Sequence, residues 1–199
     1  PGKGASGRVA GEAETGRVGS VDFLAESGIV VPAERVAPVV RAGKTAIVNA
    51  LAYVGDEPFL ALNGDILTDL DLTAMTAFHR DREAAVTIAL QHVEDARPFG
   101  LVPTREDGRV IEFREKPEQL VPGDVNAGTY LLDPRVLRAW TVDRAISIER
   151  EIFPALIANG EAVYGYVSSP YWLDLGTPEQ YLQAHFDLLE GCIAGYAAR

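Results

Sequence analysis

This chain has one cysteine, no long apolar run and no excess of basic residues. The single cysteine, Cys192, excludes a disulfide or a cysteine-based metal site within one chain. No apolar run approaches the ~20 residues of a membrane span, and the first residues lack the apolar stretch of a signal peptide, so we expect a cytoplasmic protein with no membrane partner. The formal net charge of −11 argues against nucleic acid as a partner.

The pattern that is present predicts an α/β fold. The 199 residues suit one domain, and from residue 43 onward strand-like runs alternate with helical ones. A turn at residues 106–108 predicts one antiparallel hairpin. We expect edge strands at 29–31 and 36–40, further strands at 59–63, 85–90, 100–103, 110–114, 127–132 and 163–167, and helices at 45–53, 72–79, 134–140, 149–159 and 178–190.

Two aspartates follow strand-like runs and lie next to a glycine or close to one. Asp65 ends the segment Phe59–Asp65, and Asp174 ends Tyr171–Asp174. Ligands of open α/β sheets collect outside the carboxyl ends of the strands, so the two carboxylates could converge on Mg²⁺ and a phosphate compound. Each segment alone is equally well explained as a turn.

Three further segments carry polar groups at predicted strand ends. Glu115 could accept hydrogen bonds from sugar hydroxyls, and Lys116 could bind a phosphate. Asn126 offers a donor and an acceptor to a hydroxyl, and Gly128 allows a ligand close to the backbone. Taken singly, a solvated charge pair and an Asx turn are the simpler interpretations. Gly100 lies at a strand entry.

Two acidic segments are predicted to act only as helix caps. Ser147 is placed to cap a helix, with Glu149 and Glu151 in its first turn, and that structural role accounts for both acids. The segment Asp69–Asp71 has the Asp-x-Asp spacing of a metal motif found in other glycosyl-processing enzymes, but its place at a helix start favours capping.

Six segments in this order resemble the sugar-1-phosphate nucleotidylyltransferases, most closely their mannose-1-phosphate guanylyltransferase branch. The relatives that act on glucose-1-phosphate come next. The resemblance covers about residues 43–190 and is more specific for the superfamily than for the sugar. The segments are Asn63–Asp65, Phe99–Gly100, Phe113–Pro117, Asn126–Gly128, Ser147–Pro154 and Tyr171–Pro178.

The resemblance implies a Rossmann-like mixed, mostly parallel sheet flanked by helices. It also implies a reaction in which a sugar-1-phosphate oxygen attacks the α-phosphorus of an NTP and pyrophosphate leaves. The expected substrates are GTP and mannose-1-phosphate, with glucose-1-phosphate as the alternative sugar. Asp65 and Asp174 would hold Mg²⁺ and act in catalysis with Lys116, which would bind the sugar phosphate. The other substrate contacts implied are Gly64, Gly100, Glu115, Asn126 and Gly128.

The family's glycine-rich loop, of the type Gly-Gly-x-Gly-Thr-Arg-Leu-x-Pro, has no counterpart in this sequence. We therefore expect an N-terminally incomplete fold with an atypical segment at 1–42, a nucleotidylyltransferase core with the sugar-phosphate site at 43–191, and a tail at 192–199. An active enzyme and a catalytically impaired homologue that binds nucleotide sugars or regulates a partner subunit are both open at this point, as is a homo-oligomer.

Overall fold

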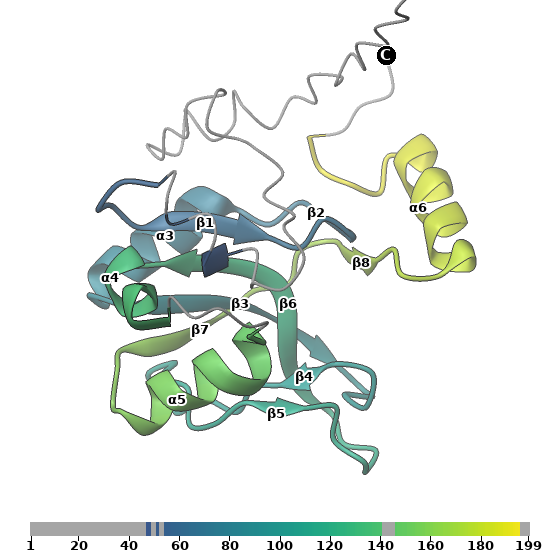
Figure 1. Ribbon diagram of the computed structural model, residues 1–199. Helices are drawn as coiled ribbons and strands as arrows, with labels where there is room; N and C mark the ends of the chain where they lie inside the picture. Colours follow the sequence, from purple (N-terminus) through teal and green to yellow (C-terminus); the bar gives the residue numbers. More distant parts are fainter. Residues whose placement is uncertain (1–46, 49–50, 52–53, 141–145, 196–199) are drawn as a thin grey trace, which may run out of the picture.

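Six strands form a central sheet, and two more form a small ribbon beside it (Figure 1). The structure is a computed structural model that describes residues 47–48, 51, 54–140 and 146–195. The strands of the central sheet lie in the order β5-β4-β6-β3-β7, with β1 also paired to β6. Their bounds are β1 Phe59–Leu62, β3 Val86–Val93, β4 Gly100–Leu101, β5 Arg114–Glu115, β6 Gly123–Leu132 and β7 Val163–Val167.

The sheet is mixed, as predicted, but the expectation of mostly parallel pairing is wrong for the described strands. β6 runs antiparallel to β1, β3 and β4, β4 runs antiparallel to β5, and β3 pairs in parallel with β7. The chain passes from β3 to β6 through the short strands β4 and β5 and not through a helical crossover, so it returns in the opposite direction. β1, β3 and β7 consequently point the same way and end at the same edge.

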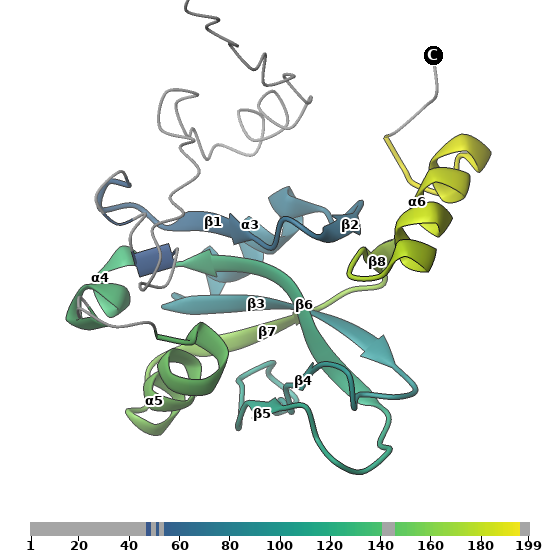
Figure 2. The ribbon, with the colours of Figure 1, turned by 45° about the vertical axis from the view of Figure 1, so that its right-hand side comes forward.

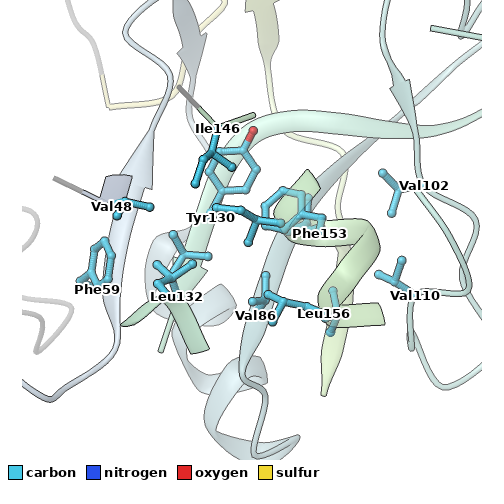
Figure 3. Close-up of a cluster of buried hydrophobic side chains, with 14 of the residues drawn as sticks. Val48, Phe59, Val86, Val102, Val110, Tyr130, Leu132, Ile146, Phe153 and Leu156 are labelled. Atoms are coloured by element: carbon cyan, nitrogen blue, oxygen red, sulfur yellow. The ribbon is translucent and has the colours of Figure 1, made fainter. Parts of the chain in front are cut away.

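Helices cover both faces of the central sheet (Figures 1 and 2). On one face, α3 packs through Met75 against Ala89 and Leu131. The other face is covered by α4 and α5, and the side chains beneath them are drawn in Figure 3. Alternate side chains of β3 and β6 pack against opposite faces of the sheet, because successive side chains of a strand point in opposite directions. The helices are α3 Leu72–Asp81, α4 Pro134–Leu137, a 3-10 turn Arg138–Trp140, a π-helical turn Ile148–Ile152, α5 Phe153–Ala158 and α6 Pro178–Glu190.

Local signals placed several element boundaries correctly, but the sequence did not predict β2 (Ile66–Thr68) and placed β5 and the start of β6 several residues away. Thr177 caps α6 by accepting from the Gln180 N–H at 3.2 Å, and Gly191 ends that helix with φ 74°. Gly108, with φ 85°, forms the turn of the predicted hairpin, where Thr104 and Val110 pair as an antiparallel bridge.

Most of the expected helix 45–53 and both expected edge strands lie outside the described residues. Within the described ranges, no helix is long and apolar enough to cross a membrane.

Candidate active site

The two aspartates predicted to bind metal are brought together by the ribbon of β2 (Ile66–Thr68) and β8 (Trp172–Asp174). In this antiparallel pair Asp174 lies opposite Ile66, and the Leu175 N–H donates to the carbonyl oxygen of Asp65 at 2.7 Å. Asp65 lies in the exposed turn between β1 and β2, and Asp174 is half-buried. Two residues far apart in sequence therefore meet through backbone pairing.

Aromatic contacts hold this ribbon against the central sheet. The Trp172 indole N–H donates to the carbonyl oxygen of Ala127 in β6 at 3.0 Å, and its ring packs edge-on against Phe99, with 5.3 Å between the centroids. Asp69 accepts from the Tyr171 N–H at 2.7 Å. The ribbon with Asp65 and Asp174 thus has a fixed place beside the predicted sugar-binding segment of β6.

The Asp69–Asp71 segment has the structural role that the sequence predicted. Asp71 accepts from the Ala74 N–H at 2.9 Å and caps α3. Both carboxylate oxygens of Asp69 accept from backbone N–H groups, of Tyr171 at 2.7 Å and of Ala194 at 2.9 Å. These bonds join distant parts of the chain.

A β-bulge in β6 shapes the centre of the site. Ile88 of β3 pairs with Tyr130 and Leu90 pairs with Asn126, so five residues of β6 stand opposite three of β3. Gly128, inside the bulge, has φ 75°, and a Cβ there would lie 2.8 Å from Nδ2 of Asn63. The bulge, which the sequence did not predict, turns the Asn126–Gly128 segment toward the end of β1.

The Asn126 side chain is buried and makes three hydrogen bonds inside the protein. Its Nδ2 donates to the Tyr130 hydroxyl at 2.8 Å and to Oε1 of Glu149 at 2.7 Å, and its Oδ1 accepts from the Gly128 N–H at 3.1 Å. Tyr130 packs against Phe153 in the core, as Figure 3 shows, and burial raises the pKa of its hydroxyl. Asn126 is therefore fixed between the core and the site.

Glu115 and Gly100 are neighbours across β5 and β4. They pair directly in the antiparallel register, and a Cβ on Gly100 would lie 3.2 Å from Oε2 of Glu115. The Phe113 ring would be closer still, at 2.7 Å, so the space at residue 100 is limited mainly by that ring. The next residue, Lys116, has an exposed side chain and the unusual φ of 50°, and its N–H donates to the carbonyl oxygen of Phe99 at 3.0 Å.

Glu149 was not predicted as a site residue. Its carboxylate lies with Glu115, Lys116 and Asn126 in one polar cluster. Its predicted role was limited to the first turn of a capped helix, and Ser147 does cap that turn by accepting from the Arg150 N–H at 3.1 Å. The turn is π-helical, however, and the Glu149 side chain faces β6. Burial and the neighbouring Glu115 raise the pKa of Glu149, and the bond from Asn126 and the charge of Lys116 oppose that shift.

Only the tertiary contact could reveal Glu149. Its position in the first turn of a helix is equally favourable for an acid with no other role. A π-helical turn often marks a functional site, but local sequence gives little sign of one. The partly buried hydrogen bond from Asn126, 23 residues away in sequence, is the decisive observation.

The donor set at the ribbon fits a hard divalent cation. The Asp65 carboxylate makes no hydrogen bond or ion pair with any described residue, and Asp174 commits Oδ1 to the Gly176 N–H at 2.7 Å, which leaves its Oδ2 available. Within the described ranges, no three His, Cys, Asp or Glu side chains are grouped to hold a metal. The remaining ligands of an ion here would be water and substrate phosphate, the arrangement that Mg²⁺ favours.

A depression of about 670 Å³ lies away from this site, at the end of the sheet where β3 and β7 begin. It contains none of the predicted site residues. Its lining includes Asp133, Arg135, Trp140, Asn159 and Glu161.

Comparison with known proteins identifies the family of this chain. The family described as "Nucleotidyl transferase" matches residues 30–191. Mannose-1-phosphate guanylyltransferase of Mycobacterium tuberculosis is 40% identical over 154 residues, which cover 77% of this chain and 43% of that protein. The chain thus spans less than half the length of this relative.

Two solved structures share the fold. HddC from Yersinia pseudotuberculosis, complexed with GMP-PN, superposes with a TM-score of 0.62 and 24% identity over 82% of this chain and 72% of that chain. A putative glucose-1-phosphate thymidylyltransferase from Bacillus anthracis superposes with a TM-score of 0.67 and 20% identity over 84% of this chain and 70% of that chain. With the family match over most of its length, the chain belongs to the nucleotidyl transferase family.

Proposed function

We propose that the protein transfers a nucleotidyl group from GTP to mannose-1-phosphate, giving GDP-mannose and pyrophosphate. A sugar-phosphate oxygen attacks the α-phosphorus, and the bond from that phosphorus to the pyrophosphate oxygen breaks. The observation that carries the proposal is the β2–β8 pairing, which places Asp65 and Asp174 together beside the polar cluster of β5 and β6.

Asp65 and Asp174 are proposed to hold Mg²⁺ at the end of the ribbon. Bound there, Mg²⁺ would neutralise charge on the phosphates. The exposed position of Asp65 leaves room for phosphate and water ligands. Gly64, which precedes Asp65, has no heavy atom within 4 Å of a Cβ placed on it, so the backbone is open to a substrate there.

The polar cluster is proposed to hold the sugar phosphate. Glu115 accepts hydrogen bonds from sugar hydroxyls, and the exposed ammonium of Lys116 binds the phosphate. The positive φ of Lys116 is a strained backbone that its neighbours must maintain, as is common at functional sites. Asn126 contacts a hydroxyl, while Gly100 and Gly128 let the sugar approach the backbone.

The relatives guide the choice of base and sugar. The M. tuberculosis relative is named for mannose-1-phosphate and a guanylyl group, and the Y. pseudotuberculosis structure holds GMP-PN. We propose the same base and sugar for this chain. A cytoplasmic location and a homo-oligomer stay predictions from the sequence.

Isothermal titration of the chain with GDP-mannose, with and without Mg²⁺, tests the proposal. UDP-glucose and dTDP-glucose serve as comparators. We expect saturable binding that Mg²⁺ strengthens and that favours the mannose compound. Asp65→Asn and Asp174→Asn should remove the Mg²⁺ effect, whereas the exposed Asp81→Asn, on the last residue of α3, is a matched control.

The alternatives predict different results. Mannose-selective binding that ignores Mg²⁺, with no turnover, would favour a nucleotide-sugar-binding homologue over an enzyme. Tighter binding of a glucose compound would mean that the proposed sugar and base are wrong, but that the proposed type of reaction still holds. No binding to any of the three by folded protein would contradict the proposal.

A further inference from the structure

The orientation of the Asn126 amide is set by two neighbours of fixed hydrogen-bonding polarity. On one side the Gly128 N–H can only donate, so it faces Oδ1 at 3.1 Å. On the other side Glu149 accepts from Nδ2 at 2.7 Å, and in its ionised form it can only accept. The Tyr130 hydroxyl, which can do either, adapts to this arrangement at 2.8 Å.

These bonds leave the Asn126 side chain able to accept a further hydrogen bond but not to donate one. Both hydrogens of Nδ2 are used, one by Glu149 and one by Tyr130. Oδ1 has two lone pairs, and the Gly128 N–H occupies one of them. The amide can therefore accept one more hydrogen bond but cannot donate another.

The π-helical turn is what brings Glu149 to Asn126. Ile152 N–H donates to the Ser147 carbonyl oxygen at 3.3 Å, five residues back, and the Phe153 N–H likewise donates to Ile148. Phe153 is fully buried against Tyr130, so the start of α5 is fixed to β6. The carboxylate is thus held in place by the core and not by a mobile surface turn.

We propose that Glu149 is a positioning residue that determines specificity. It fixes the orientation of the Asn126 amide so that Asn126 and Glu115 present only hydrogen-bond acceptors to the sugar. This part of the site therefore selects sugar hydroxyls that donate. The proposal rests on the proposed function and deepens it. The other charges facing this cluster are Lys116 and Arg150, whose Nη2 lies 4.0 Å from Oε1 of Glu115. Both are also donors, and the amide of Asn63, which contacts Tyr130 and lies beside Gly128, is another. The acceptor-only part of the site is therefore confined to Asn126, Glu115 and Glu149.

Nuclear magnetic resonance of the Asn126 side-chain amide in the full chain tests the orientation directly. Glu149→Met keeps an unbranched chain but removes the acceptor, and Glu149→Gln keeps an acceptor oxygen. We expect the Nδ2 proton shifts and their slow solvent exchange to change in Glu149→Met and to be retained in Glu149→Gln. The control is Glu106→Gln, which removes one charge from an exposed hairpin turn. Unchanged Asn126 signals in Glu149→Met would overturn the proposal.

Binding of sugar analogues tests the selectivity. GDP-mannose is compared with derivatives in which one sugar hydroxyl at a time is replaced by hydrogen or by fluorine, which accepts weakly and cannot donate. At the hydroxyl that Asn126 reads, both replacements should weaken binding to the unmodified chain equally, by about threefold to tenfold. In Glu149→Met the freed amide can turn its N–H toward fluorine, so the fluoro derivative should regain at least about threefold over the deoxy derivative.

The two measurements separate this inference from the proposed function. Suppose that, at each hydroxyl where replacement weakens binding, the fluoro derivative binds the unmodified chain more tightly than the deoxy derivative. This result would show a hydrogen-bond donor in the site and overturn the inference, while leaving nucleotidyl transfer intact. Failure of the unmodified chain to bind GDP-mannose would overturn the proposed function and with it the sugar selectivity. In that case the amide measurement would still decide whether Glu149 orients Asn126.

Discussion

Two pairs of carboxylates in this molecule, Asp65 with Asp174 and Glu115 with Glu149, differ in how they are held. The aspartates are joined by backbone pairing of β2 and β8, and Asp65 is exposed. The glutamates belong to different elements, their side chains are half-buried, and Glu149 is tied to Asn126. A pair with one exposed member suits a hydrated cation with phosphate ligands, whereas two half-buried carboxylates suit direct hydrogen bonds with hydroxyl groups.

The two pairs also differ in what can offset the repulsion between their carboxylates. Two carboxylates near each other raise the cost of ionising either one unless a cation lies between them. At the ribbon, an Mg²⁺ ion would supply that cation. At the glutamates, the charge of Lys116 only partly offsets burial and mutual repulsion, so the pKa of Glu149 stays raised.

Substitution of either aspartate is expected to have the largest effect on activity and therefore tests the difference between the two carboxylate pairs most strongly. Asp65→Asn or Asp174→Asn should lower turnover by at least about 100-fold, because a metal ion supplies several kcal/mol of charge stabilisation in the transition state. The melting temperature should change little, since the Asp65 carboxylate makes no bond to another described residue. In Asp174→Asn the amide oxygen can still accept from the Gly176 N–H. Steady-state kinetics and thermal unfolding, with Asp81→Asn as control, measure both. Near-normal rates in both variants would sink the metal assignment.

A substitution at Gly128, which lies between the two pairs, should have the next largest effect. Gly128→Ala forces a Cβ to within 2.8 Å of Nδ2 of Asn63 at φ 75°, so we expect about 2–4 kcal/mol of destabilisation and weaker Mg²⁺-dependent binding.

Gly191→Ala is the matched control for that variant. Gly191 has a similar φ of 74° but nothing within 4 Å of its Cβ position, so its cost should be only about 1–2 kcal/mol. Urea unfolding compares the two variants. Equal destabilisation would show that backbone strain alone, and not the contact with Asn63, makes Gly128 necessary.

The smallest effect concerns the pH dependence of stability at Glu149. Its pKa is raised in the folded state, so the folded protein holds this proton more tightly than the unfolded chain, and ionisation lowers stability as pH rises through the raised pKa. The penalty is absent below the ordinary value of 4.5. Glu149→Gln should therefore melt at a higher temperature than the unmodified chain at pH ~8, and this advantage should vanish below pH ~4.

The Glu106→Gln variant controls for the loss of one charge in that experiment. An advantage of Glu149→Gln that persists unchanged at acid pH would mean that the glutamine simply packs better. In that case the contrast between the aspartate pair and the half-buried glutamate pair would lose its electrostatic basis.

Local chemistry made much of this fold predictable. Asp71 and Thr177 start helices because their side chains accept from backbone N–H groups, and Gly191 ends one because it adopts a positive φ at no steric cost. The runs that became β1, β3 and β7 are apolar enough to be recognised as strands. The direction of β6 was not predictable in this way, because pairing depends on the path of the chain between strands.

The sequence by itself determined the approximate position of most helices and strands, the family to which the chain belongs, and the residue types that could bind a sugar phosphate. Tertiary structure alone decided which of those residues meet: β2 and β8 join Asp65 to Asp174, and the bulge of β6 places Asn126 against Glu149. The reason is that capping and strand propensity act over a few residues, whereas strand register and the burial of side chains depend on segments far apart in the chain.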